Sequence, residues 1–199
     1  LFLDDLPEVP RPALEALRQP LEAGRTTVSR AAAHITYPAR FQLVAAMNPC
    51  PCGYLGDPTG RCRCSTEQIA RYRNKLSGPL LDRIDLHLTV ARESTTLNNQ
   101  PCGETSADVA VRVAEARELQ HRRQGCANAF LDLEGLRHHC GLVAADQVWL
   151  EGACERLILS LRSAHRLLKV ARTLADLEQV DAISREHLAE ALQYRPATQ

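Results

Sequence analysis

The sequence has few aromatic residues, no net charge and no long apolar run. Aromatic residues make up 4% of the 199 residues, so a core must rest on leucine, valine, isoleucine and alanine. Basic and acidic residues number 24 each. Such a balance argues against a nucleic-acid footprint over the whole chain, although it leaves room for a local basic patch. No apolar run approaches the roughly 20 residues that cross a bilayer, so no membrane partner is expected.

A secretory signal is also missing from the start of the chain. The sequence opens with Leu1-Phe2-Leu3-Asp4-Asp5, without a basic region and without methionine. We therefore expect a cytoplasmic protein, and we expect this chain to be a piece of a longer one. In a reducing compartment, clustered thiols indicate metal ligands before they indicate disulfides.

The patterning predicts an α/β half followed by an all-α half. The first half, 1–92, is expected to contain strands at 1–4, 41–47 and 84–90, a hairpin of 26–30 and 34–37, helices at 13–22 and 66–75, and a helical turn at 79–83. A polar stretch, 93–105, is the best candidate for a linker. The second half, 106–199, is expected to contain helices at 106–123, 131–138, 144–161, 162–178 and 184–194.

Half of the eight cysteines are clustered in a loop rich in glycine and proline. Cys50 and Cys52 form one Cys-x-Cys pair, and Cys62 and Cys64 form a second pair after nine intervening residues. Four thiolates complete the tetrahedral shell of Zn²⁺ and leave no position for water, so we predict a structural zinc site. An iron–sulfur site is an alternative, since four thiolates also suit it, and two disulfides are another.

The other four cysteines are scattered, and we expect them to be small buried hydrophobic residues. They are Cys102, Cys126, Cys140 and Cys154. The run His138-His139-Cys140 is not predicted to be a metal site, because adjacent residues of a helix point in different directions.

Polar residues follow two of the predicted strands. Asp4 and Asp5 end an apolar run, where an acid beside a nucleotide can bind Mg²⁺ and a second acid can polarise water. Asn48 ends the run 41–47, where an amide can orient the attacking water. Each also has a plainer interpretation: the acids as a solvated strand end or a helix cap, and Asn48 as a turn residue before proline.

An arginine at a predicted helix-to-strand junction is a third candidate. Arg83 could stabilise charge on a phosphate bound to a neighbouring subunit. An ion pair with Asp82 or Asp85 explains it equally well from local sequence.

The order and wording of these segments carry a family resemblance. The matching text is LFLDDLPE, LEALRQPLEAGRTTVSRA, YPARFQLVAAMNPCPCGYLGD, LSGPLLDRIDLH and LKVARTLADL. The chain resembles the magnesium-chelatase branch of the AAA+ ATPases, and more closely the ComM-type, Mg-chelatase-like proteins. The resemblance covers essentially the whole chain. It implies a partial AAA+ α/β core over 1–92 and a helical lid domain over 106–199.

The resemblance also implies roles at the strand ends. Asp4 matches the Walker B acid that holds magnesium, and Asn48 matches sensor 1. Asp5 stands where the family usually has a catalytic glutamate. Because aspartate is one methylene shorter, hydrolysis is expected to be impaired.

Further roles fall on arginines. Arg83 matches the arginine finger supplied to a neighbouring subunit. Arg162 matches the sensor 2 arginine better than Arg166 does. The segment that contains Arg25 and Arg30 matches a hairpin that points into the pore of related ring helicases, where both could contact DNA backbone.

One family element is absent from the 199 residues, namely the phosphate-binding motif Gly-x-x-x-x-Gly-Lys-[Ser/Thr]. We therefore expect ATP and Mg²⁺ to bind only in a longer protein, which would be the ATPase, and this chain alone to be inactive. The leading hypothesis is a hexameric ring motor that acts on DNA during branch migration in natural transformation. The alternatives are a motor subunit of magnesium chelatase and a zinc-stabilised interaction module without catalysis. The Cys-x-Cys loop favours the ComM-type branch.

Overall fold

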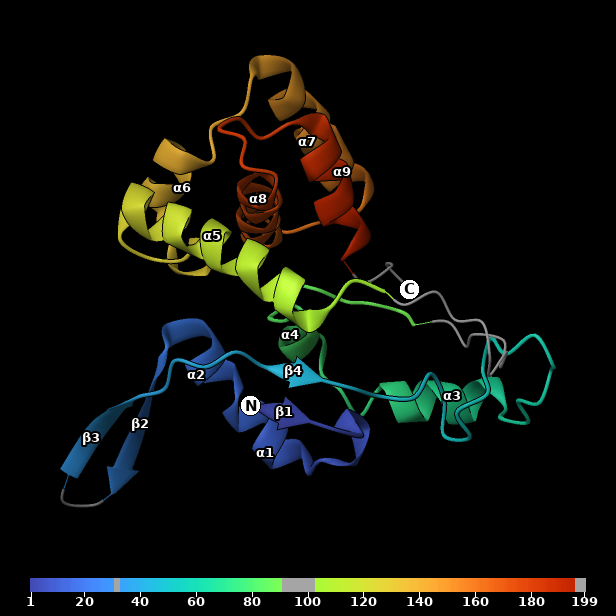
Figure 1. Cartoon of the computed structure of the whole chain (residues 1–199). Helices are drawn as coiled ribbons and strands as arrows, with labels where there is room; N and C mark the ends of the chain where they lie inside the picture. Colours follow the sequence, from blue (N-terminus) through green and yellow to red (C-terminus); the bar gives the residue numbers. More distant parts are fainter. Residues whose placement is uncertain (31–32, 91–102, 196–199) are drawn as a thin grey trace. The chain divides into compact units, whose positions relative to one another are not determined.

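The computed structural model describes residues 1–30, 33–90 and 103–195, and it divides into two compact units, Leu1–Ile84 and Asp85–Gln199. Figure 1 shows the first unit as a mixture of short strands and helices and the second as helical throughout. The predicted layout of an α/β half and an all-α half is confirmed at this level. Most of the predicted linker, 93–105, lies outside the described residues, so the predicted domain limits stay predictions.

The first unit contains two short parallel strands, each of which is followed by polar residues. β1, Phe2–Leu3, pairs with β4, Val44–Ala45, so that Phe2 lies opposite Val44. Backbone hydrogen bonds extend the pairing, because Leu6 N–H donates to the Ala46 carbonyl at 3.0 Å. The predicted strands at 1–4 and 41–47 are thus present, although regular pairing covers two residues of each.

The helices of the first unit surround a small leucine core. They are the 3-10 helix η1 (Leu6–Glu8), α1 (Arg11–Ala16), α2 (Arg18–Ala23), α3 (Thr66–Arg73) and α4 (Gly78–Leu81). The core consists of Leu6, Leu14, Leu76 and Leu80. The single helix predicted at 13–22 is in fact two. Pro20 explains the break, because it has no N–H to donate to the carbonyl of Ala16.

The predicted hairpin is confirmed. β2, Arg25–Arg30, pairs antiparallel with β3, Ala33–Pro38, and Val28 lies opposite Ile35. Alternation along the strands places Thr26 and Val28 with Ile35 and Tyr37 on one face of this ribbon.

The prediction of a strand at 84–90 is wrong. In the ranges that the structure describes, the sheets are β1–β4 and β2–β3, and neither contains this segment. Alternating apolar residues predict a strand only where a neighbouring strand can pair with it. Here the N–H of His87 donates to the carbonyl of Tyr194 at 2.7 Å, and Leu88 and Val90 are 72% and 91% exposed.

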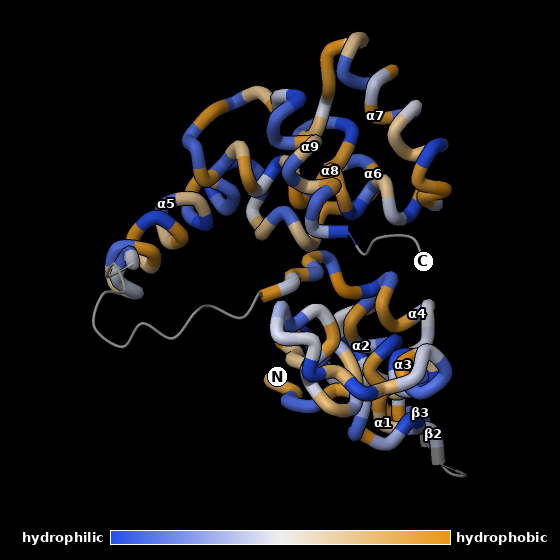
Figure 2. Tube along the Cα trace, turned by 90° about the vertical axis from the view of Figure 1, so that its right-hand side faces the viewer, coloured by the Kyte–Doolittle hydropathy of each residue, from blue (hydrophilic) through white to orange (hydrophobic). Residues whose placement is uncertain are grey.

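The second unit packs its helices around one central helix, α8. The helices are α5 (Ser106–Gln124), the 3-10 helix η2 (Asn128–Phe130), α6 (Leu133–His139), α7 (Ala144–Arg156), α8 (Leu161–Leu177) and α9 (Arg185–Gln193). Figure 2 shows apolar and polar residues alternating along these helices, as expected for helices with one buried face. Leu167, Ala171 and Leu188 belong to the buried core. No described helix is long and apolar enough to cross a membrane.

Helix ends in the second unit follow local capping. The predicted helix 144–161 is too long, because α7 ends at Arg156 and the backbone turns left-handed at Ile158, with φ 51°. Ser160 then caps α8 by accepting from the N–H of Ser163. The predicted start of the last helix is confirmed, since Ser184 and His187 form a reciprocal capping box.

Candidate functional site

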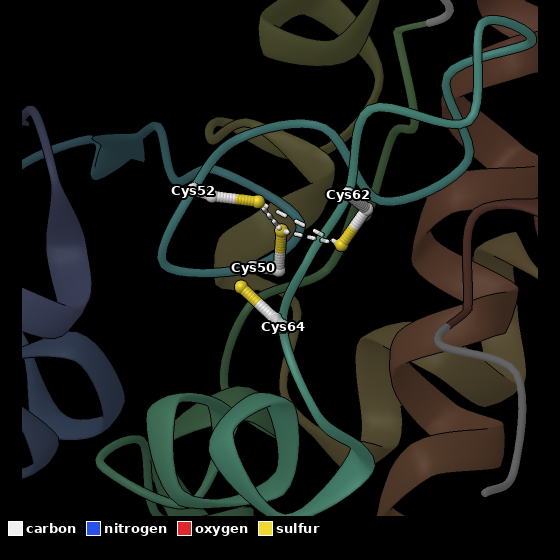
Figure 3. A group of neighbouring side chains, drawn as sticks. All are labelled: Cys50, Cys52, Cys62 and Cys64. Atoms are coloured by element: carbon white, nitrogen blue, oxygen red, sulfur yellow. Dashed lines mark hydrogen bonds between the residues drawn. The ribbon is translucent and has the colours of Figure 1, made fainter.

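The four clustered cysteines converge in space. Their sulfur atoms all lie within 4.8 Å of one another, and Figure 3 shows them turned toward a common centre from two stretches of the loop. The Sγ of Cys50 lies 3.3 Å from that of Cys52 and 3.7 Å from that of Cys62. Cys50 is fully buried, while Cys52, Cys62 and Cys64 are partly exposed. Among the described residues this is the one cluster of three or more His, Cys, Asp or Glu side chains with metal-binding spacing.

These sulfur distances suit a single tetrahedral ion. A zinc ion with bonds of about 2.3 Å to four thiolates places neighbouring sulfurs about 3.8 Å apart. A disulfide needs sulfurs about 2.05 Å apart, and the Cys52–Cys62 separation is 3.6 Å. A multi-iron cluster distributes its four cysteines over two or more irons and so needs a wider spread. The cluster can therefore hold one metal ion.

Local turns bring the first Cys-x-Cys pair into this geometry. Gly53 N–H donates to the Cys50 carbonyl at 3.0 Å, and Gly53 has φ 79°, a left-handed conformation that glycine adopts without strain. This turn aims backbone N–H groups at sulfur: that of Tyr54 donates to Cys52, and that of Leu55 donates to Cys50. Such donors stabilise a thiolate, which is the form that binds metal.

The pKa values of the clustered thiols are shifted in different directions. The N–H of Tyr54 is the main cause that lowers the pKa of Cys52, to about 6. The hydrogen bond with Cys52 is the main cause that raises the pKa of Cys64, to about 12. Burial acts to raise the pKa of Cys50, but backbone N–H donors outweigh it and the pKa is lowered. Metal binding must therefore release protons from this cluster.

A cavity of about 380 Å³ opens beside the cysteines. Cys52, Cys64 and Tyr72 contribute to its wall. The cavity therefore lies against two of the four cysteines.

The polar strand ends meet at one edge of the first unit. The side-chain amide of Asn48 donates to the carboxylate of Asp5, with Nδ2 and Oδ1 3.4 Å apart. Asp4 lies beside them, and its carboxylate accepts from the N–H of Asp5 at 3.0 Å. All three residues are exposed. Parallel pairing of β1 and β4 explains the meeting, because parallel strands end at the same edge of a sheet.

The predicted arginine finger makes contacts within its own unit. The guanidinium of Arg83 donates to both Glu22, at 2.6 and 3.1 Å, and the carbonyl of Pro79. Its side chain is 14% exposed. Asp85, one of the partners considered for it, pairs instead with Arg166 at 2.6 Å. The structure thus shows a structural contact at Arg83, and its role in another subunit stays a prediction.

The remaining predicted arginines lie on other elements. Arg162 is exposed in the first turn of α8, in the second unit. Arg25 is exposed at the start of β2, where it pairs with Pro38, and Arg30 ends the same strand opposite Ala33. The predicted roles of these arginines stay predictions.

The scattered cysteines were predicted to be buried; this is confirmed for Cys140, whereas Cys126 and Cys154 are partly buried. Cys140 is buried in the core of the second unit, and Cys126 and Cys154 pack against that core. Burial raises the pKa of Cys140 to about 11. Cys102 lies outside the described residues.

One residue of the site was missed by sequence reasoning. Tyr72, on α3, is 7% exposed, and its hydroxyl accepts from the backbone N–H of Asn48. Burial is the main cause that raises its pKa, and the charge of Asp5 adds to it. The available signal was the single aromatic residue of the mostly polar helix that follows Cys64.

Comparisons with known proteins decide the family. A model described as magnesium chelatase, subunit ChlI, matches residues 1–98, and one described as the ChlI C-terminal region matches 103–195. The chain belongs to the Mg-chelatase family. It is 52% identical over 198 residues to the protein YifB of Escherichia coli, and 50% identical over 198 residues to the competence protein ComM of Haemophilus influenzae. It is 41% identical over 199 residues to the Mycobacterium tuberculosis protein Rv2897c.

The matches to these relatives cover nearly all of the chain but only part of each relative. They include 98% of the chain in every case, against 38% of YifB and ComM and 39% of Rv2897c. The resemblance to Mg-chelatase-like, ComM-type proteins is thus confirmed. The chain spans well under half of the length of these relatives.

Proposed function

We propose that this Mg-chelatase family chain is the C-terminal part of an AAA+ ATPase that works as a ring-shaped motor on DNA. The contact between Asn48 and Asp5 carries the proposal. An acid and an amide at adjacent parallel strand ends are the groups that orient water and bind magnesium at a γ-phosphate. In this proposal Asp4 holds Mg²⁺, Asp5 polarises the water, and Asn48 senses the phosphate.

The exposed apolar strands also support a core larger than this chain. Phe2 is 63% exposed and Val44 is 50% exposed, although they pair in a parallel sheet. Parallel sheets are ordinarily covered on both faces. We infer that further chain of the longer protein covers β1 and β4 and supplies the phosphate-binding loop, so that ATP binds only there.

The arginines complete the proposed machinery. Arg83 acts as the finger toward a neighbouring subunit after release from Glu22, and Arg162 acts as sensor 2. A finger supplied in this way requires self-assembly, for which we propose a hexameric ring.

DNA is the proposed substrate for two reasons. A relative that is 50% identical carries the name competence protein, and the β2–β3 hairpin presents an exposed Arg25. Arg25 and Arg30 would bind DNA backbone without reading its sequence. A chelatase motor subunit is the second candidate, favoured by the description of the family models.

Zn²⁺ is the proposed occupant of the cysteine site. Four thiolates fill its shell, so the ion would be structural and would not take part in catalysis. This part of the proposal is independent of the motor, because all four ligands lie within the chain.

The test uses the full-length protein with its phosphate-binding loop. ATP hydrolysis should rise when branched DNA is added, and branched DNA should be unwound or migrated in an ATP-dependent reaction. Hydrolysis without any response to DNA, together with stimulation by a porphyrin-binding partner, would favour the chelatase function. Absence of hydrolysis under both conditions would leave a zinc-stabilised interaction module.

A further inference from the structure

We propose that the metal ion in the cysteine site fixes the position of Asn48, so that the four cysteines act as positioning residues for the strand edge. The inference concerns the chain itself. Only its consequence for hydrolysis rests on the proposed function.

The first Cys-x-Cys pair continues directly from Asn48. Only Pro49 separates Asn48 from Cys50, which is 0% exposed. The loop then folds back over the amide: a methyl group added at Gly53 would lie 3.7 Å from the Asn48 Oδ1. Cys50 and Gly53 thus lie close to the side chain that donates to Asp5.

The second Cys-x-Cys pair continues directly into α3. Ser65, the residue after Cys64, caps this helix through a reciprocal box with Gln68. α3 then returns to the same place, because the Tyr72 hydroxyl accepts from the Asn48 backbone N–H. Its Arg73 donates to the Pro49 carbonyl at 3.4 Å. A metal bound by all four sulfurs joins the two segments that contact Asn48.

The loop itself buries little of its chain. Cys50 is the one buried residue of 49–64, and local turns such as Gly60 N–H to the Asp57 carbonyl at 3.0 Å shape the loop. Ordering a glycine-rich loop that has a single buried residue costs conformational entropy at every residue. Metal bonds between residues that lie 10–14 positions apart offset that cost. Loss of the metal should free the loop and, with it, Asn48.

The experiment measures Asn48 directly by NMR in the 199-residue chain, loaded with Zn²⁺ or stripped with a chelator. Removal of zinc should speed hydrogen exchange of the Asn48 backbone N–H about tenfold or more, as expected when a local hydrogen bond no longer closes. The Asn48 side-chain NH₂ resonance should shift toward solvent-exposed values. The side-chain amide of Asn128, which donates to Asp176 at 2.7 Å in the second unit, is the internal control and should not change.

Two variants sharpen the test. Tyr72→Phe should keep zinc but speed exchange at Asn48, because its N–H no longer has an acceptor. Cys64→Ser should reproduce the stripped spectrum, and Cys126→Ser, a cysteine outside the cluster, should match the zinc-loaded one. An unchanged Asn48 after verified loss of zinc would overturn the proposal. So would collapse of all resonances from 1–84, because the metal would then be a general folding element.

The outcome is separable from that of the proposed motor. If zinc fixes Asn48 but the full-length protein never hydrolyses ATP, the positioning role of the cysteines is supported and the proposed motor is contradicted. If ATP is hydrolysed equally well with and without zinc while Asn48 is unaffected, the proposed motor is supported and the positioning role of the cysteines is contradicted.

Discussion

The side-chain amide of Asn48 lies 3.4 Å from the carboxylate of Asp5, although the two residues are 43 positions apart in the sequence. Each ends a strand, and the strands pair in parallel. Asp5 itself has a left-handed backbone, with φ 46°, which turns its carboxylate back toward Asn48. A short acid in this turn reaches the amide.

Lengthening this acid should change catalysis. In the full-length ATPase, Asp5→Glu adds one methylene and should raise the steady-state rate of ATP hydrolysis by roughly tenfold, a modest part of the usual general-base contribution. Asp4→Asn is the control, because loss of the magnesium acid should abolish hydrolysis with either residue at 5. An unchanged rate in Asp5→Glu would show that the shorter acid does not limit turnover.

The cysteine cluster should bind one metal ion per chain. Elemental analysis of the purified chain should find zinc in about equimolar amount, since four thiolates fill one tetrahedral shell. Cys64→Ser should lose this zinc, whereas Cys126→Ser should keep it. Iron in place of zinc, or a metal-free protein with oxidised cysteines, would contradict the assignment.

Acid should release the metal before it unfolds the second unit. Protons compete with the ion for thiolates, and the Cys64 thiol, with a pKa raised to about 12, binds its proton most tightly. Zinc retention should therefore fall as pH decreases. A chromogenic zinc indicator follows the release, and the fluorescence of Trp149, the one tryptophan of the sequence, follows the second unit in the same sample. Simultaneous loss of both signals would argue against a separate site.

The hairpin should contribute to DNA affinity through charge. In the full-length protein, replacing Arg25 and Arg30 with alanine should weaken binding to branched DNA. The slope of log K against log salt should fall by about 1 for each phosphate that is no longer neutralised. Arg71→Ala removes a charge from α3, where the arginine is 76% exposed and pairs with Glu67, and serves as the matched control. Equal effects of hairpin and control substitutions would remove the role of the hairpin.

Sequence reasoning succeeded where short-range rules act. Two apolar runs that end in polar residues predicted the strands that Asp5 and Asn48 follow, and two Cys-x-Cys pairs predicted the convergence of sulfurs. Ser184 and His187 likewise specify a helix start through neighbours three positions apart. In each case the structure is determined by neighbouring residues or by the chemical preference of a particular side chain.

Sequence reasoning failed where the structure of a segment depends on a residue far away in the sequence. The segment 84–90 alternates like a strand, but no strand lies beside it among the described residues. The contact of Arg83 with Glu22 joins residues 61 positions apart, and local sequence pointed instead to adjacent acids. Tyr72 could not be linked to Asn48 without the fold that brings α3 back to the loop.

The buried carboxylate of Asp176 should determine much of the stability of the second unit. Its side chain is 0% exposed and accepts from Arg123 at 2.6 Å and from Asn128 at 2.7 Å. Asp176→Asn should lower the free energy of unfolding by about 3–5 kcal/mol, because Arg123 and Arg172 lose their charged partner in the interior. Urea unfolding followed by Trp149 fluorescence measures this. Glu151→Gln, on the exposed face of α7, should stay within about 0.5 kcal/mol of the wild type.

The same carboxylate gives the second unit a pH dependence of known sign. Burial acts to raise the pKa of Asp176, but hydrogen bonds from Arg123 and Asn128 and the charge of Arg172 outweigh it, so the pKa lies below its ordinary value of 3.8. A depressed pKa in the folded state means that the contribution is present above 3.8 and is lost as pH falls through the folded-state pKa. The stability difference between wild type and Asp176→Asn should therefore be full at neutral pH and shrink on acidification below 3.8. A difference that stays constant across that range would show that packing, rather than charge, holds these helices together.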